Sequence, residues 1–366
     1  MVRVRRHATS RRVAGILLSV LLVVIAVQAV STKSSPSTVD SGTAASPINA
    51  KAIGFAEGYS LLDKDTVTLD HDFDAMRSLG GTWIRVEMNW RTIEPVPGQQ
   101  DWSAVDRVVA AATRHGLQVV GLLTAAPRWA SDPNAGDALG SRPNRPDAFG
   151  SFSGAAADRY RATIRVWEIW NEPNIPIFFV PAPDVDLYAP LLKAAHIAIH
   201  AVRPDAIVLT AGTAAANDTA VTIAPTTFVN RLYRLGMAPY FEGVAMHPYT
   251  FPFTPQNDPN GNWDSVSDVR RIMVANGDEK KGIWLTEFGV PTGSSGDAMT
   301  EAQQSAILED AIQTAGRMPF VYGPLLIYMI RDMGTDASWR ENCFGVLRYD
   351  YSPKQSALML RRIRPE

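Results

Sequence analysis

The sequence is poor in cysteine, since Cys343 is the only one in 366 residues. A single cysteine excludes an intrachain disulfide. No histidine-containing motif surrounds it that would mark a nucleophile, and a free cysteine generally behaves as a small apolar side chain. We therefore expect Cys343 to be buried and to have no chemical role.

An excess of charge is also absent. The formal net charge is −2, and no run rich in Lys and Arg follows residues 1–12. This argues against nucleic acid as a partner. The stretch GFAEGYS, after the first apolar run, lacks the glycine pattern that binds the phosphates of a dinucleotide. We expect no organic cofactor, and nothing in the sequence implies an obligate protein partner.

Residues at the spacing typical of metal ligands are scarce as well. His196 and His200, in HIAIH, have the i, i+4 spacing of a helical metal pair. The glutamate of the HExxH pattern is missing and no third ligand is evident. We therefore expect these histidines to lie on a helix surface or to serve in packing, and we expect no metal.

The N-terminus carries a long apolar run. Residues 1–30 begin with a strongly basic stretch and continue with the uncharged segment Val13–Val30. This segment is long enough to span a bilayer with the arginines in the cytoplasm, and it equally fits a signal peptide cleaved after Val27-Gln28-Ala29. Either interpretation predicts a chain outside the cytoplasm, secreted or anchored to the membrane. Residues 31–50, rich in Ser, Thr, Ala and Pro, predict a flexible linker, and residues 51–366 predict one globular domain.

Within this domain, short apolar, β-rich runs alternate with longer amphipathic stretches. The runs comprise residues 52–57, 83–90, 117–125, 166–172, 206–213, 241–249, 282–289 and 324–332. Eight strand–helix alternations predict a parallel sheet of the α/β class, and eight strands close a (β/α)₈ TIM barrel. An open, doubly wound sheet is the alternative, but it normally carries a glycine-rich turn after its first strand.

Helix candidates lie between these runs, at residues 72–80, 103–116 and 300–318. Asp101–Ser103 and Thr300 resemble N-caps. Gly80 and Gly116 resemble C-caps. The segment before the fourth run, residues 150–165, looks too short for an intact third helix.

Polar residues end several of the predicted strands, where the active groups of such barrels lie. They are Arg85, Glu87, Asn89, Asn171, Glu172, His247, Tyr249, Glu287, Tyr328 and Asp332. Glu172 and Glu287 end strands four and seven, so their carboxyl groups could meet across the mouth of the barrel. Hydrolysis of a glycosidic bond requires one protonated and one ionised carboxyl group, about 5 Å apart for retention or about 6.5–9.5 Å apart for inversion.

A further acid, Glu168, has the same inward parity as Glu172. At about 3.3 Å per residue it lies about 13 Å deeper in the barrel. We expect Glu168 to be structural and to need a buried partner, such as Arg85.

The ordered motifs resemble the clan A glycoside hydrolases, most closely the cellulase-like families and the xylosidase-like family 39. The motifs are NEP at 171–173, LTEFG at 285–289, W-x2-IEP-x2-G-x2-DW at 90–102, PRWA at 127–130, HPY at 247–249 and YSPKQSA at 351–357. The likeness covers nearly the whole globular domain, and it implies a retaining β-glycosidase on a TIM barrel.

By that resemblance, Glu172 is the general acid/base and Glu287 the nucleophile. Asn171 is similar to the amide that binds the sugar 2-hydroxyl, and Arg85 to the arginine that keeps the nucleophile ionised. His247 and Tyr249 are similar to the pair that orients the carboxylates and the sugar.

The aromatic residues differ from the family pattern at one point. Related enzymes usually carry a tryptophan on strand eight as the floor of the sugar site, whereas here Tyr328 is the nearest aromatic residue. Trp129, after strand three, and Trp263, in the long loop after strand six, are further candidates for stacking on a sugar ring. Trp90 and Trp170 can equally be packing residues at the barrel rim.

These observations predict a retaining β-glycoside hydrolase without cofactor or metal. Its expected substrate is an extracellular or cell-envelope polysaccharide or oligosaccharide, with attack inside the polymer slightly favoured. Two alternatives remain open. One is a transglycosylase that uses the same pair of glutamates, and the other is a non-catalytic carbohydrate-binding or envelope protein on a decayed barrel.

Overall fold

The computed structural model describes residues 52–363. The predicted targeting segment (1–30) and linker (31–50) lie outside the described residues. Within residues 52–363, no helix has both the length and the apolar character needed to cross a membrane.

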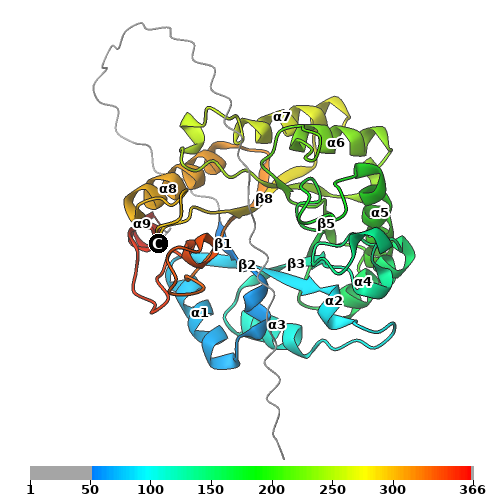
Figure 1. Cartoon of the computed structure of the whole chain (residues 1–366), viewed down its shortest axis with the longest axis horizontal. Helices are drawn as coiled ribbons and strands as arrows, with labels where there is room; N and C mark the ends of the chain where they lie inside the picture. The colour runs from blue at the N-terminus through cyan, green and yellow to red at the C-terminus, as the bar shows by residue number, and fades with distance from the viewer. Residues whose placement is uncertain (1–51, 364–366) are drawn as a thin grey trace, which may run out of the picture. The chain divides into compact units, whose positions relative to one another are not determined.

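The described residues form a closed barrel of parallel strands surrounded by helices (Figure 1). In sheet order the strands are β5 (Ile207–Leu209), β4 (Val166–Ile169), β3 (Gln118–Thr124), β2 (Gly81–Asn89), β1 (Ile53–Ala56), β9 (Val321–Ile327), β8 (Gly282–Phe288), β7 (Gly243–His247) and β6 (Thr213–Ala214). Leu209 on β5 also pairs with Gly243 on β7, which closes the barrel. The short strand β6 pairs with the end of β7.

The eight barrel strands are therefore β1 to β5 and β7 to β9. Each of the eight predicted runs overlaps one of them, although β2 and β9 begin two and three residues before their runs. The predicted (β/α)₈ barrel is confirmed, and the open doubly wound sheet is excluded.

The helices lie in the outer ring of Figure 1. They are α1 (Thr66–Ser78), α2 (Trp90–Ile93), α3 (Ser103–Arg114), α4 (Pro146–Arg159), α5 (Val185–Val202), α6 (Pro225–Arg234), α7 (Asp264–Ala275), α8 (Glu301–Arg317) and α9 (Gln355–Ile363). Short 3₁₀ turns occupy Tyr59–Asp63, Arg128–Ala130, Pro133–Ala135, Ala238–Tyr240, Pro255–Asn257 and Arg340–Cys343.

The predicted caps agree with the structure, but α1 begins at Thr66, six residues before the predicted start at residue 72. Thr300 caps α8 in a reciprocal capping box with Gln303. Asp101 accepts a hydrogen bond from the Ser103 backbone at 2.9 Å at the start of α3. Gly80 (φ +87°) and Gly116 (φ +65°) follow α1 and α3 with a left-handed backbone, which glycine adopts without steric cost.

The expectation that residues 150–165 are too short for a helix is wrong. The helix α4 begins earlier, at Pro146, and runs to Arg159. A Cβ atom at Gly150 would lie 3.1 Å from the Ala194 carbonyl oxygen of α5, and one at Gly154 would lie 3.3 Å from the Ala198 side chain. The small residues that weaken the helical pattern allow α4 to pack closely on α5. This packing offsets the low helix propensity of glycine, about 1 kcal/mol per residue.

Two apolar clusters lie on the two sides of the barrel wall. The larger one fills the space between strands and helices. The smaller one lies inside the barrel and comprises Ala56, Val120, Val166, Leu209, Ala245, Trp284 and Leu326, with Trp83 packed against it. Each strand of the barrel contributes one of these residues, so the interior is a packed layer rather than a pore. Cys343 is 5 % exposed, as expected for a buried thiol.

Candidate active site

The interior of the barrel changes from apolar to polar toward the C-terminal ends of the strands. Side chains point to the same face at every second residue of a strand. Of the eight residues two positions beyond the apolar layer, five are polar: Arg85, Glu168, His247, Thr286 and Tyr328. A polar layer thus lies directly above the packed one, at the mouth where such barrels bind substrate.

The two glutamates singled out by the sequence meet in this layer. Glu172, on the loop after β4, accepts a hydrogen bond from Nδ1 of His247 at 2.8 Å. Glu287, on β8, accepts hydrogen bonds from the Tyr249 hydroxyl at 2.7 Å and from Nη1 of Arg85 at 3.0 Å. One carboxylate oxygen of Glu172 and one of Glu287 lie within 4.8 Å of each other.

Arg85 connects Glu287 to the deeper acid, Glu168. Its Nε and Nη2 atoms donate to the two oxygens of Glu168 at 2.8 and 3.0 Å. Nη2 also donates to Oδ1 of Asn171 at 2.8 Å. Glu168 is fully buried, and its predicted partner, Arg85, is confirmed. The same guanidinium serves the structural acid and Glu287.

His247 and Glu168 are held in their charged forms. Burial by itself would raise the pKa of Glu168, but the charge of Arg85 and the contact with His247 lower it to about 2. Burial would likewise lower the pKa of His247, but the charge of Glu287 and the contacts with Glu168 and Glu172 raise it to about 9. The imidazole is therefore protonated at neutral pH.

A chain of hydrogen bonds follows from that protonation state. Both ring nitrogens of His247 carry a proton, so Nδ1 donates to Glu172 and Nε2 donates to Oγ1 of Thr286 at 3.1 Å. The Thr286 hydroxyl in turn donates to Glu168 at 3.2 Å. Glu172, His247 and Glu287 are close enough together to surround a metal ion, but an imidazolium has no lone pair for one. Among Glu172, His247 and Glu287, a proton is therefore held on His247.

The loop that carries Glu172 has an unusual backbone. Trp170 (φ +75°) and Glu172 (φ +45°) both lie in the left-handed region, at a cost of about 1–3 kcal/mol each. The indole N–H of Trp170 donates to the Phe178 carbonyl at 2.7 Å. The amide of Asn174 donates to the carbonyls of Ala214 and Ile223 at 2.9 Å. These contacts hold the strained loop, and the strain turns the Glu172 carboxylate toward His247.

Gly212, after β5, fits beneath this loop because it has no side chain. Its carbonyl accepts from the Glu172 backbone at 2.9 Å, and its N–H donates to Glu168 at 2.9 Å. A Cβ atom here would lie 2.1 Å from Nε2 of His247 and 2.7 Å from Glu168. Any larger residue would displace the histidine.

The aromatic candidates occupy different environments. Trp129 is partly exposed, and its indole N–H donates to the Glu94 carbonyl at 3.0 Å. Tyr328 is partly exposed beside Phe344, with ring centroids 5.1 Å apart. Trp90 and Trp170 are buried, as expected for packing residues.

Trp263 requires a correction. It is only 2 % exposed and packs edge-to-face on Phe288, with ring centroids 5.5 Å apart. The loop folds the indole inward at the start of α7, where it covers apolar surface that would otherwise face water. Trp263 therefore belongs to the core and offers no face to a sugar ring.

Some residues of the site were missed or not developed from the sequence. Thr286, which relays the His247 contact, lies directly before Glu287 and could have been found from strand parity. Glu87, on β2, accepts a hydrogen bond from Asn89 at 3.0 Å. Burial raises the pKa of Glu87, and the charge of Glu287 adds to this effect, which places a third carboxyl group beside the pair.

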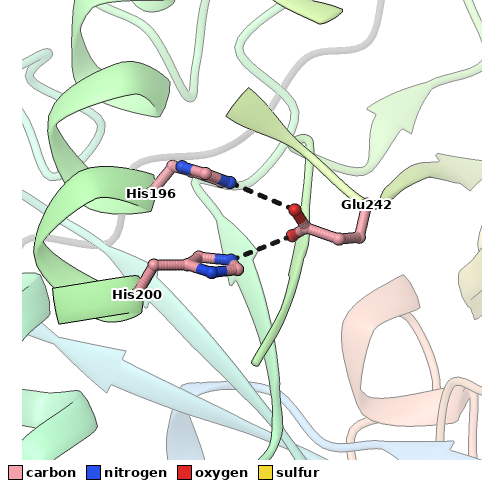
Figure 2. Close-up of side chains that lie close together, drawn as sticks. All are labelled: His196, His200 and Glu242. Atoms are coloured by element: carbon pink, nitrogen blue, oxygen red, sulfur yellow. Dashed lines mark hydrogen bonds and ion pairs between the residues drawn. The ribbon is translucent and has the colours of Figure 1, made fainter. Parts of the chain in front are cut away.

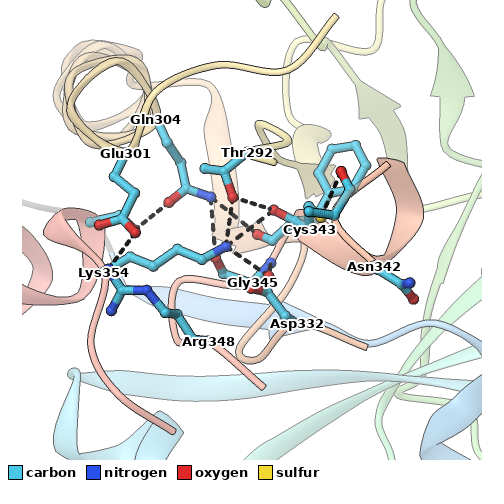
Figure 3. Close-up of polar contacts among 12 residues, drawn as sticks. Thr292, Glu301, Gln304, Asp332, Asn342, Cys343, Gly345, Arg348 and Lys354 are labelled. Carbon is cyan, nitrogen blue, oxygen red and sulfur yellow. Dashed lines mark hydrogen bonds and ion pairs between the residues drawn. The ribbon is translucent and has the colours of Figure 1, made fainter. Parts of the chain in front are cut away.

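The loops that follow β8 and β9 are joined by a buried polar network (Figure 3). Lys354 donates to Asp332 at 2.7 Å, to Thr292 at 2.8 Å and to the Cys343 carbonyl at 3.2 Å. Gln304 of α8 donates to the Gly345 carbonyl at 3.1 Å. Asp332, which ends a predicted strand, thus serves in bracing the rim and does not join the carboxylate pair.

Comparison with known proteins adds a family and a set of similar structures. Residues 48–316 match the model of the cellulase family, glycosyl hydrolase family 5. No curated protein matches the sequence.

Among solved structures, a family 39 glycoside hydrolase from Bacteroides cellulosilyticus WH2 is 22 % identical with a TM-score of 0.70, and the match covers 86 % of this chain and 63 % of that one. A monomeric β-xylosidase from Caulobacter crescentus CB15 is 18 % identical with a TM-score of 0.64, covering 84 % of this chain and 66 % of that one. A family 5 subfamily 18 protein from Streptomyces cattleya, in complex with GlcNAc, is 17 % identical with a TM-score of 0.64, covering 86 % of this chain and 80 % of that one. At these identities the likeness shows the fold. The chain spans less than two thirds of the length of the first two proteins.

Proposed function

Because the chain belongs to the cellulase family, glycosyl hydrolase family 5, we propose that it is a retaining β-glycoside hydrolase that acts by double displacement. The approach of the Glu172 and Glu287 carboxylates to within 4.8 Å carries this proposal. Retaining enzymes hold their two carboxyl groups about 5–5.5 Å apart, whereas inverting enzymes need about 6.5–9.5 Å to admit a water molecule.

In the first step, Glu287 attacks the anomeric carbon while Glu172 gives its proton to the glycosidic oxygen. The carbon–oxygen bond breaks, and a glycosyl ester of Glu287 forms with inversion. In the second step, Glu172 takes a proton from water, which attacks the same carbon and releases Glu287. The two inversions together retain the β configuration.

The contacts of the site favour this division of roles. Arg85 and Tyr249 both donate to Glu287, whereas Glu172 has the His247 imidazolium as its neighbour. After Glu172 has given its proton to the glycosidic oxygen, the imidazolium donates to the new carboxylate at 2.8 Å.

Tyr249 and Asn171 are suited to orient the reacting groups. Burial and the charge of Glu287 raise the pKa of Tyr249 well above its ordinary value, so its hydroxyl remains a donor to Glu287. The Asn171 oxygen is already engaged by Arg85, which leaves the amide NH₂ group to donate to a sugar hydroxyl. Trp129 and Tyr328 supply aromatic surface for sugar rings on either side.

The substrate we propose is a β-linked polysaccharide or oligosaccharide of the cell envelope or the surroundings, with attack inside the polymer. The basic and apolar N-terminal residues support a location outside the cytoplasm, secreted or tethered by an N-terminal helix.

A screen of aryl β-glycosides and polysaccharides with wild type and Glu172→Ala tests the mechanism. The variant should lose about 10²–10⁴-fold in kcat/KM on substrates with poor leaving groups. Azide should restore turnover and give a β-glycosyl azide, and NMR of the wild-type reaction should show the β anomer first. Glu309→Gln, which changes a glutamate on the outer helix α8 that pairs with Arg362 at 3.0 Å, is the matched control and should behave as wild type. An α anomer as first product, or an active Glu172→Ala without azide, would refute the proposal.

Transglycosylation with the same pair is the second candidate function. Product analysis over a range of acceptor concentrations separates it from hydrolysis, because a transglycosylase transfers sugar to the acceptor even when water is in large excess.

A further inference from the structure

A second group of histidines and a glutamate lies away from the carboxylate pair. His196 and His200, in the last turns of α5, project toward Glu242, the residue before β7 (Figure 2). Nε2 of His196 lies 3.1 Å from Oε1 of Glu242, and Nε2 of His200 lies 3.3 Å from Oε2. Glu242 is the third group that the HIAIH motif lacked in the sequence, and it comes from a different element of the fold.

The three side chains are arranged as the ligands of a metal ion would be. The two imidazole rings are stacked, with centroids 4.2 Å apart and an interplanar angle of 24°, so both Nε2 atoms point the same way. One atom from each of the three residues lies within 4.8 Å of the others. Ligands at about 2.0–2.1 Å from a tetrahedral zinc ion lie about 3.3 Å from one another. The observed nitrogen–oxygen separations match this value.

The carboxylate of Glu242 has few competing partners. Among the described residues, the ion pairs of Glu242 are with these two histidines and with no lysine or arginine. The Val208 N–H donates to Oε2 of Glu242 at 2.8 Å and fixes the orientation of the carboxylate, as outer-shell donors do at metal sites.

Two further features suit a cation. His200 lies in the last turn of the 18-residue helix α5, where the aligned peptide dipoles favour positive charge. The side chains of His196, His200 and Glu242 are 14, 25 and 36 % exposed, so an ion can enter from solvent and keep water as a fourth ligand.

We propose that His196, His200 and Glu242 bind a divalent transition-metal ion, zinc in the first place, which fastens α5 to the start of β7. Two imidazoles and one carboxylate favour zinc over magnesium or calcium, which prefer oxygen ligands alone. The site lies at the N-terminal end of β7, opposite the carboxylate pair. At that end of a TIM barrel, residues serve stability.

Zinc titration of the full chain after treatment with chelator tests this proposal. Isothermal titration calorimetry should show one zinc ion per chain, and zinc should raise Tm by several degrees. Cobalt(II) added in place of zinc should give the intense visible absorption of a tetrahedral or five-coordinate site. His200→Gln and Glu242→Gln should each weaken zinc binding at least about 100-fold and abolish both the Tm shift and the cobalt spectrum. Two variants guard against the failure of either one to fold.

Two controls locate the ion. His115 lies 2.9 Å from Asp70 and 3.0 Å from Asp74 on the outer surface, so His115→Gln removes a histidine flanked by carboxylates without touching the proposed site. It should bind zinc as wild type does, and so should Glu287→Gln, which alters the other histidine–glutamate trio. Failure of wild type to bind zinc, or retention of binding in both His200→Gln and Glu242→Gln, would overturn the proposal. Loss of binding in Glu287→Gln would move the ion to the carboxylate pair and overturn it as well.

Discussion

Two clusters of histidine and glutamate lie at the two ends of one strand, β7. His247 is the last residue of this strand, and Glu242 directly precedes its first residue. In both clusters a carboxylate oxygen lies at ordinary hydrogen-bond distance from an imidazole nitrogen, 2.8 Å for Glu172 and 3.1 Å for Glu242. The residue types are the same, but the surroundings give them different chemistry.

The ratio of histidines to carboxylates separates the two clusters. His247 is one fully buried imidazole among Glu168, Glu172 and Glu287, and their charges keep it protonated. At the other end, two imidazoles share the single carboxylate of Glu242, and they are partly exposed. A buried histidine with surplus negative charge around it holds its proton, whereas two partly exposed histidines can release their Nε2 protons when a metal ion binds.

Glu287→Gln should give the largest effect, and it should show that only one of the two clusters is needed for activity. Removal of the nucleophile should lower kcat on the order of 10⁵-fold, as loss of a covalent nucleophile does elsewhere. Steady-state kinetics on an aryl β-glycoside measures the change, with circular dichroism to verify folding. Glu242→Gln should stay within about twofold of wild type, because a residue remote from the site perturbs the reaction little. Comparable losses in the two variants would mean that the clusters act as one site.

Arg85→Met should give the next largest effect, this time on stability. The substitution removes the cation that pairs with both oxygens of the fully buried Glu168 and leaves only the His247 imidazolium, 3.7 Å away, which costs about 3–5 kcal/mol. Arg231→Met is the matched control, because Arg231 pairs with Asp186 at the surface, where an ion pair contributes about 0–1 kcal/mol. Urea unfolding of both variants measures the difference. Equal losses would show that the Arg85–Glu168 pair does not stabilise the fold beyond an ordinary surface pair.

The architecture was predictable because the strands of a closed barrel are apolar and the helices amphipathic. Each run therefore overlapped a strand, but the ends of the runs were less accurate. The fourth run was extended to Glu172, whereas β4 ends at Ile169. The left-handed backbone of Trp170 and Glu172 ends the strand there, and no residue type in the sequence announces it, since neither position is glycine.

The positions of the site residues were predictable where the alternation of side chains along a strand determines them. They were not predictable where the packing of a loop determines them. Parity placed Arg85 beside Glu168, and strand ends brought Glu172 toward Glu287. The burial of Trp263 depends on how a long loop folds over Phe288, which the loop sequence alone does not show. Glu242 is 46 residues from His196 along the chain and lies at the strand end opposite the predicted site, so a search for local motifs cannot connect the two.

The pH dependence of stability should separate the protonated cluster from the other one. The pKa of His247 is raised from 6.5 to about 9 in the folded chain. Its contribution is therefore fully present below pH 6.5 and is lost as the pH rises toward 9, on the order of 3 kcal/mol in total. Urea unfolding between pH 6 and pH 10 should show this loss in wild type and not in His247→Gln. A wild-type curve that stays flat over this range would contradict a protonated His247.

Removal of zinc should give the smallest effect, a loss of stability without a loss of activity. If zinc is present at 100 times its dissociation constant, its removal lowers stability by about 2.7 kcal/mol. Chelator should thus lower the Tm of wild type but not of Glu242→Gln, which has already lost a ligand. The value of kcat/KM at 25 °C should remain within about twofold, because the folded population stays near unity and the ion lies at the far end of β7 from Glu172. If chelator abolished activity while the chain stayed folded, the metal would belong with Glu172, His247 and Glu287. The division of β7 into a proton-holding end and a metal-holding end would then be wrong.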